Sequence, residues 1–119
     1  MIEKSKGFTR VYKAAYYSYK GFRACLVYEA AFRQELVMAF VLIPLALWLP
    51  VSKLERVAMV GVVVFVLIVE LLNSAVEAVV DRVGYEKHEL AGRAKDMGSA
   101  AVLLSLLLWA YVWGSILFL

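Results

Sequence analysis

Residues 70–84 have the sequence Glu-Leu-Leu-Asn-Ser-Ala-Val-Glu-Ala-Val-Val-Asp-Arg-Val-Gly and continue an apolar run that starts near residue 57. Such a run is typical of a membrane-spanning helix, yet three carboxylates and an Asn interrupt it. With about 100° of rotation per helical residue, one sector roughly 100° wide holds Glu70, Asn73, Ser74, Glu77 and Asp81. Ionised groups in hydrocarbon cost around 2.5–3.5 kcal/mol each on insertion scales, so this polar face needs a specific reason to be there.

The composition of the whole chain also indicates a membrane protein. The chain has 119 residues, of which 64% are apolar, whereas soluble domains are about 45–50% apolar. A bilayer core requires roughly 20 helical residues, and three segments meet this requirement: residues 30–49, 57–80 and 97–119. We therefore predict an all-α membrane protein, a single domain over residues 1–119 with three transmembrane helices.

Residues 7–26 predict a helix of another kind, which is too charged to span a membrane. Its apolar residues recur at steps of three and four: Phe8, Val11, Tyr12, Ala15, Tyr19, Phe22 and Leu26. This pattern predicts an amphipathic surface helix in the headgroup plane. Residues 1–33 are rich in Lys and Arg, which suits an anionic membrane surface better than nucleic acid. The single cysteine, Cys25, excludes an intrachain disulfide.

The Lys and Arg residues also predict the orientation. They are concentrated in residues 1–33 and 81–96, whereas the loop 50–56 contains only two. By the positive-inside rule, the N-terminus and the second loop are cytoplasmic, and the C-terminus is on the outer side. The polar face then opens toward the cytoplasm, where ATP is available. If Asp81 marks the interface, a rise of about 1.5 Å per residue puts Glu77 about 6 Å and Glu70 about 16 Å from it.

Carboxylates on one helix face repel each other, so a divalent metal, a proton or both must accompany them. Polar residues at the cytoplasmic ends of the other two spans are available to join this face: Glu29, Arg33, Gln34, Glu35, Arg93, Lys95, Asp96 and Ser99. Simpler roles remain open. Glu70 and Glu77 could be structural hydrogen-bonding or proton-sharing residues, and Asn73 a helix–helix hydrogen bond only. Glu29 and Glu35 could be interfacial charges, and Lys95 and Asp96 a flanking ion pair. No P-loop, Gly-x-Gly-x-x-Gly or nucleophile elbow is present in the sequence. The residues by themselves therefore predict a small membrane protein with a buried carboxylate site.

Four segments resemble the bacterial integral-membrane diacylglycerol kinases. They are residues 7–15, which include Gly-Phe-Thr-Arg and Lys-Ala-Ala; residues 29–35, Glu-Ala-Ala-Phe-Arg-Gln-Glu; residues 70–82; and residues 88–102, which include Ala-Lys-Asp-Met-Gly-Ser. The resemblance implies a homotrimer in the inner membrane, with a surface helix and three transmembrane helices per chain. It also implies Mg²⁺- and ATP-dependent phosphorylation of diacylglycerol to phosphatidic acid, at cytoplasmic-side sites shared between neighbouring chains.

The same resemblance implies roles for individual residues. Glu70 corresponds to the catalytic base, and Asn73, Lys95 and Asp96 to further catalytic residues. Glu29 and Glu77 correspond to the Mg²⁺ ligands. The implied nucleotide-binding residues are Arg10, Tyr17, Glu29, Glu77, Glu86, Lys87, His88, Lys95 and Asp96. The implied substrate-binding residues are Arg10, Ala14, Ser18, Arg23, Ala31, Gln34, Glu35, Trp48, Arg56, Glu70, Ser99 and Trp113.

Two other functions are alternatives. Undecaprenol kinases share the Glu/Asn/Glu helix and the Ala-Lys-Asp segment, but residues 7–10 and 29–35 favour the diacylglycerol branch. A small proton-coupled transporter would also use an intramembrane Glu. The clustering of polar residues near one interface, with apolar outer halves of all three spans, disfavours a transport path.

Overall fold

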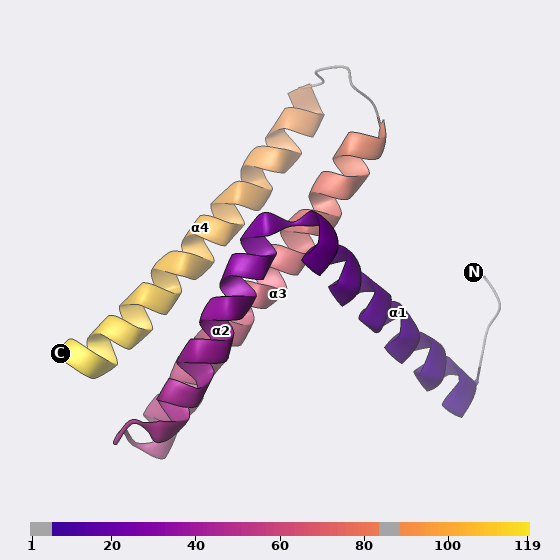
Figure 1. The fold of residues 1–119 in the computed structure, drawn as a ribbon. Coiled ribbons are helices and arrows are strands. Elements are labelled where there is room, and N and C mark those ends of the chain that lie inside the picture. Colours follow the sequence, from indigo (N-terminus) through magenta and orange to yellow (C-terminus); the bar gives the residue numbers. More distant parts are fainter. Residues whose placement is uncertain (1–5, 84–88) are drawn as a thin grey trace.

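The computed structural model of the chain describes residues 6–83 and 89–119. This part contains four helices: α1 (Phe8–Tyr28), α2 (Ala30–Trp48), α3 (Lys53–Val83) and α4 (Glu89–Phe118) (Figure 1). The predicted all-α fold is confirmed, and α2, α3 and α4 are each long and apolar enough to cross a membrane. Both α3 and α4 extend beyond the predicted apolar spans, because helical backbone continues into the polar residues that flank each span.

Local sequence signals explain where the helices begin and end. A reciprocal capping box starts α3: the Glu55 N–H donates to Ser52 Oγ at 3.1 Å, and the Ser52 N–H donates to Glu55 Oε1 at 2.9 Å. At the end of α2, the backbone becomes extended at Leu49 (φ −64°, ψ 147°), directly before Pro50. A single extended residue, Glu29 (φ −118°, ψ 108°), separates α1 from α2. The chain therefore turns sharply at a residue that carries a carboxylate.

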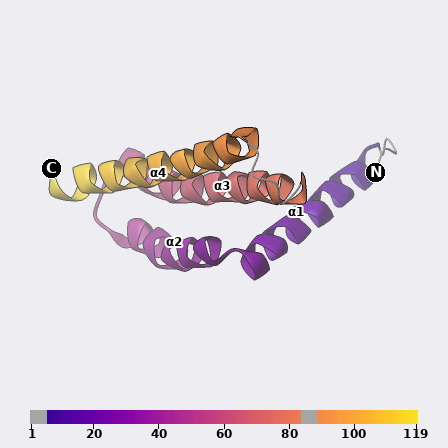
Figure 2. The same ribbon diagram turned by 90° about the horizontal axis from the view of Figure 1, so that it is seen from above.

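The central helix of the bundle is α3, which packs against both α4 and α2 (Figures 1 and 2). Its buried residues recur at steps of four and three and therefore form one stripe: Met59, Val63, Val66 and Glu70. The buried residues of α2 recur every seven positions and form a second seam: Phe32, Ala39 and Ala46. The stripe of α3 runs directly into the predicted polar face, since Glu70 belongs to both.

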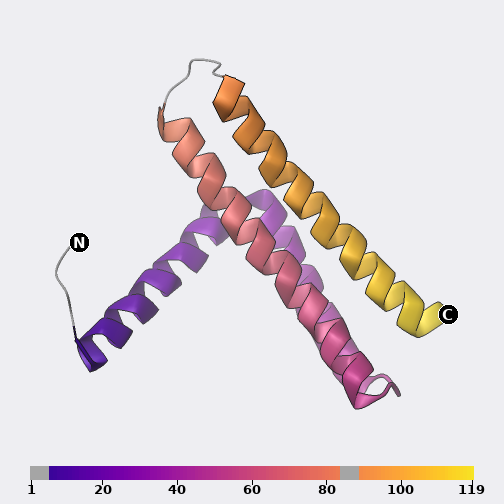
Figure 3. The same cartoon turned by 180° about the vertical axis from the view of Figure 1, so that it is seen from behind.

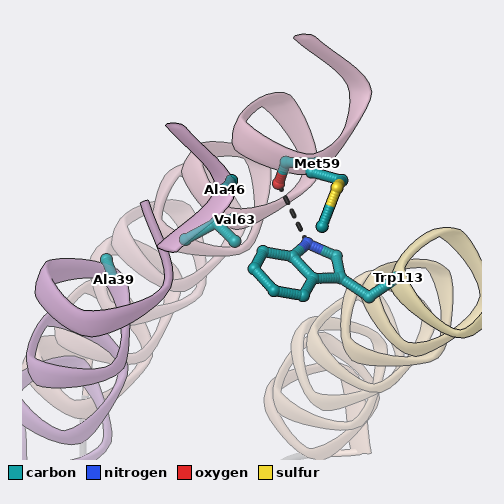
Figure 4. Close-up of a cluster of buried hydrophobic side chains, with 5 residues drawn as sticks. All are labelled: Ala39, Ala46, Met59, Val63 and Trp113. Atoms are coloured by element: carbon teal, nitrogen blue, oxygen red, sulfur yellow. Dashed lines mark hydrogen bonds between the residues drawn. The ribbon is translucent and has the colours of Figure 1, made fainter. Parts of the chain in front are cut away.

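A small apolar cluster joins α2, α3 and α4 (Figure 4). Trp113 of α4 reaches α3, where its indole Nε1 donates a hydrogen bond of 3.0 Å to the Met59 carbonyl. Ala39 and Ala46 have short side chains, which allow the α2 backbone to approach closely. Many large apolar side chains point outward instead; Phe40, for example, is 73% exposed. Such apolar surfaces need lipid or another protein chain to cover them.

The direction of α1 crosses that of the other three helices, and its N-terminal end points away from the bundle (Figure 3). Cys25 is its buried residue, and the Cys25 thiol donates to Ser74 Oγ of α3 at 3.5 Å. The aromatic residues near the start of α1 are exposed, including Phe8 at 94% and Tyr12 at 73%. One end of α1 is therefore attached to α3, while the rest extends outward. Its location at a membrane surface stays a prediction.

Candidate active site

Glu70 is the buried carboxylate at the centre of the candidate site, with 4% of its surface exposed. Asn73, one turn further along α3, directs its amide Nδ2 toward Glu70 Oε2 at 3.5 Å, a long hydrogen bond. From α2, the Glu35 side chain reaches hydrogen-bonding contact with Glu70. The other Glu35 oxygen, Oε1, is buried without a hydrogen-bond partner among the described residues. Glu70 thus lies between an amide donor and a second carboxyl group, a pair that requires a shared proton or a cation.

The sharp turn between α1 and α2 brings Glu29 beside the carboxylates of α3. Its pKa is raised above the usual range, first by burial and then by the negative charges of Glu77, Glu70 and Asp81. Arg33 acts in the opposite direction on this carboxyl group, but its Nη1 is also hydrogen-bonded to two carbonyl groups at the end of α1. The cluster therefore has an excess of negative charge and favours a cation.

The residues present fit a magnesium ion. Glu29 and Glu77 offer carboxylates from the turn and from α3, respectively. Within residues 6–83 and 89–119, no group of three or more His, Cys, Asp or Glu side chains could hold a metal ion by itself. Mg²⁺ commonly binds one or two carboxylates and completes its octahedral shell with water and substrate phosphates. A site of two carboxylates suits this ion and does not resemble a four-ligand structural zinc site.

Helix α4 contributes a cation to the same region. Lys95 Nζ forms an ion pair of 2.8 Å with Asp81 Oδ1 of α3, and both side chains are largely exposed. Asp96 and Ser99 are also exposed on α4. Close by, Gly98 faces the Asn73 side chain. Lys95 and Gly98 of α4 therefore lie beside the polar face of α3 within one chain.

A groove of about 390 Å³ lies between α1 and α3 and reaches Glu29. Small side chains line most of it: Gly21, Ala24, Cys25, Ser74, Ala75 and Ala78. Sequence reasoning did not identify this groove, the contact between Cys25 and Ser74, or the close approach of Gly98 to Asn73. The available signal was the coincidence of small residues in 21–25 and 74–78, which permits a close approach of two helices.

Several other predicted site residues lie apart from these carboxylates within the chain. The outward part of α1 carries Arg10, Ala14, Tyr17 and Ser18, all exposed, whereas Arg23, also exposed, lies in the part of α1 that packs on α3 (Figure 1). Arg10 precedes Glu29 by roughly 28 Å of helix length. At the opposite end of the bundle, near the turn between α2 and α3, lie Trp48, Arg56 and Trp113. Ala31 and Gln34 are exposed on the first turns of α2. Glu86, Lys87 and His88 lie outside the described residues.

Comparisons with known proteins agree with the resemblance of the motifs. The sequence profile of the family described as prokaryotic diacylglycerol kinase matches residues 16–117. A protein of Escherichia coli (strain K12) named diacylglycerol kinase is 54% identical over 113 residues, which cover 95% of this chain and 93% of the relative. Relatives with the same name are 48% identical in Haemophilus influenzae, covering 97% of this chain and 98% of the relative, and 50% identical in Pseudomonas aeruginosa, covering 93% and 90%.

The profile matches most of the chain, and these relatives match over nearly their full length. The matched region includes α2, α3 and nearly all of α4, and therefore Glu70 and the residues around it. Three membrane-length helices and relatives from bacteria also fit a protein of the inner membrane. The chain belongs to the prokaryotic diacylglycerol kinase family, and hence to the lipid kinases.

Proposed function

We propose that this chain transfers the γ-phosphoryl group of ATP to diacylglycerol, producing phosphatidic acid and ADP, at the cytoplasmic face of the inner membrane. The observation that carries the proposal is the burial of Glu70, 4% exposed, beside the Asn73 amide in a helix of membrane-spanning length. The names of the relatives support diacylglycerol as the substrate and phosphorylation as the reaction. The excess of negative charge around Glu29 supports a bound cation.

In the proposed reaction, Glu70 acts as the general base. It accepts the proton of the primary hydroxyl of diacylglycerol while the hydroxyl oxygen attacks the γ-phosphorus and ADP departs. Asn73 holds the Glu70 carboxylate in place through its amide. Phosphoryl transfer depends mainly on alignment and on neutralising charge, so Lys95 and Asp96 would position the phosphates and Arg10 would contact the nucleotide.

Glu29 and Glu77 would hold Mg²⁺, which when bound neutralises phosphate charge. Glu77 lies seven residues from Glu70, or about 10 Å along the helix axis. The nucleotide would therefore bind at the end of the polar face that is nearer to the cytoplasm. Diacylglycerol has a small headgroup, and its hydroxyl would meet Glu70 at the deeper end. Both the N-terminus and the second loop, predicted at residues 81–96, would then be cytoplasmic, with the C-terminus on the outer side.

We further propose a homotrimer in which chains complete one another's sites. The direction of α1 supports this arrangement, because its N-terminal half, which contains Arg10 and Tyr17, leads away from the other three helices (Figure 1). The exposed apolar residues on α3 and α4 also leave surfaces for neighbouring chains. In this assembly, α1 would lie on the membrane surface and carry lipid-binding and nucleotide-binding residues toward the next chain.

Phosphorylation by the purified full-length chain in mixed micelles tests the proposal, with diacylglycerol, ATP and Mg²⁺ as reactants. Glu70→Gln should lower kcat by about 10²–10⁴-fold, the usual contribution of a general base. The matched control is Glu55→Gln, on the same helix at the capping box, where Gln also caps; its turnover should equal that of the unmodified chain. Full turnover by Glu70→Gln would disprove the assignment of the base. If the chain phosphorylated undecaprenol but not diacylglycerol, it would be an undecaprenol kinase, the alternative function.

A further inference from the structure

Gly98 differs from the other described glycines in what surrounds it. A Cβ atom added at Gly7, Gly21, Gly61, Gly92 or Gly114 would meet no heavy atom within 4 Å. At Gly98 the same atom would overlap Asn73 Oδ1 and lie 3.2 Å from Asn73 Cγ. The side chain of Asn73 therefore occupies the space in which any other residue at position 98 would have its Cβ.

We infer that Gly98 is a positioning residue for the general base, because it leaves room for the Asn73 carboxamide to lie between α3 and α4 with its amide directed at Glu70. The inference rests on the proposed function, since it concerns the same base. Gly98 itself has no side chain to touch a substrate. Its effect would be exerted entirely through Asn73.

The surroundings of Asn73 fix which way its amide points. Nδ2 lies 3.5 Å from Glu70 Oε2, while Oδ1 faces Gly98, buried and without a hydrogen-bond partner in the described part of the chain. Exchanging the two ends would put the amide oxygen against the ionised Glu70 carboxylate that a general base presents, and neither group could then donate. The position that lets Asn73 donate to Glu70 therefore requires that its oxygen pack against the backbone of α4.

A side chain at position 98 would remove this arrangement. The Asn73 carboxamide would have to rotate away from α4, or α4 would have to move away from α3. Either change alters the distance between the amide and Glu70, which is already long. Displacements of about 1 Å around a reacting group can lower a rate by roughly a hundredfold. The expected effect is therefore on kcat, while the binding of ATP at the other end of the site is preserved.

Glycine is also an unfavourable residue in the interior of a helix, and alanine is the most favourable one. Gly98→Ala should therefore help α4 to form as an isolated helix. If this variant loses activity or stability, the change is opposite to the stabilisation that helix propensity predicts. This contrast separates the contact with Asn73 from a general effect on α4.

The experiment compares Gly98→Ala with Gly114→Ala in the full-length protein. Gly114 is the matched control, because it lies in the same helix, is also partly buried and has open space around it. For Gly98→Ala, we expect kcat for diacylglycerol phosphorylation to fall roughly tenfold to a hundredfold, with KM for ATP changed less than twofold. Gly114→Ala should retain both constants within twofold. An unchanged kcat in Gly98→Ala, or a change confined to KM, would overturn the inference.

A double-mutant cycle with Asn73→Ala identifies the partner. Asn73 Cβ lies 3.9 Å from the Cβ position at Gly98, an ordinary contact distance, so the double variant fits without overlap. Gly98→Ala should therefore lower kcat and the thermal midpoint in the unmodified chain and change neither in the Asn73→Ala chain. An equal loss in both backgrounds would mean that Gly98 acts through another residue. The thermal midpoints test the contact between Gly98 and Asn73 even if the chain phosphorylates no lipid. A chain without lipid phosphorylation would refute the proposed function but not this contact.

Discussion

Arg56 closes the end of α2, and its replacement should destabilise the protein. Its Nε donates to the Ala46 carbonyl at 3.1 Å, and its Nη2 donates to the carbonyls of Leu49 at 2.9 Å and Val51 at 3.3 Å. The last carbonyls of a helix have no partner within the helix. For Ala46 the nearest candidate donor along the chain would be residue 50, which is Pro50 and has no N–H. The guanidinium also places positive charge at the negative end of the α2 dipole.

The magnitude follows from these three bonds. A hydrogen bond with a charged partner contributes about 1.5–3 kcal/mol, and the lower end applies here because Arg56 is only partly buried and one guanidinium makes all three bonds. Three bonds of about 1.5 kcal/mol each mean that Arg56→Met should reduce the free energy of unfolding by about 4–5 kcal/mol. Arg56→Lys should cost about 2 kcal/mol, because an ammonium keeps the charge but lacks the planar geometry that reaches several carbonyls.

Unfolding in dodecyl maltoside micelles with increasing SDS, followed by circular dichroism, measures this loss. Lys53→Met is the matched control: Lys53 is in the same turn, is exposed and makes no hydrogen bond or ion pair to any described residue. Its effect should stay within about 0.5 kcal/mol. If Arg56→Lys unfolded at the same SDS fraction as Lys53→Met, the hydrogen bonds to these carbonyls would not explain the contribution of Arg56 to stability. A variant with full stability but reduced lipid turnover would instead support the substrate-binding role that the family resemblance implies.

Two further results are expected. Lys95→Met should lower kcat/KM for ATP roughly tenfold or more, because it removes a charged donor to phosphate. The thermal midpoint should not shift, since the ion pair with Asp81 is exposed. An equal loss of kcat/KM in Asp81→Asn would show that the ion pair, and not the lysine alone, is required. Burial raises the pKa of the Cys25 thiol, and the thiolate is the form that reacts with a maleimide. A maleimide should therefore label the folded protein roughly tenfold more slowly than the SDS-unfolded protein. Labelling of the folded protein should become faster as the pH rises. Equal labelling rates in the two states would contradict the packing of α1 on α3.

The helices were predictable because the signals for them are local. Apolar runs of sufficient length predicted α2, α3 and α4 as membrane-length helices, and Pro50 correctly predicted where the first of these ends. The periodicity around Glu70 predicted a polar face, and the structure places Glu70 in a buried stripe with Val63 and Val66. Each of these features depends on the sequence of one helix and on fixed helical geometry.

Contacts between helices could not be predicted in the same way. Periodicity identifies the buried face of α3 but not the residue of α2 that meets Glu70, so the contact with Glu35 required the structure. Likewise, Gly98 has no side chain that would identify it as part of a site. The role inferred for it depends on the distance between α3 and α4 at the level of Asn73. The roles proposed for Arg10 and Tyr17 would depend on other chains, and the sequence of one chain contains no direct measure of such an arrangement.

The exposure of the acidic residues along α3 explains how one helix face could serve two substrates of opposite solubility. Glu70 is 4% exposed, Glu77 is partly buried, and the Asp81 side chain is 66% exposed. Water therefore becomes scarcer along the face from Asp81 to Glu70. ATP carries several negative charges and would remain at the solvent-exposed end of the face, near Asp81, where Lys95 and a bound cation would offset these charges. The hydroxyl of diacylglycerol, which stays with its acyl chains in the bilayer, would meet the base at the dry end, where electrostatic interactions are stronger. Seven residues separate Glu77 from Glu70, about 10 Å of helix, so the γ-phosphoryl group of an extended ATP can span this distance while its base and ribose remain in water.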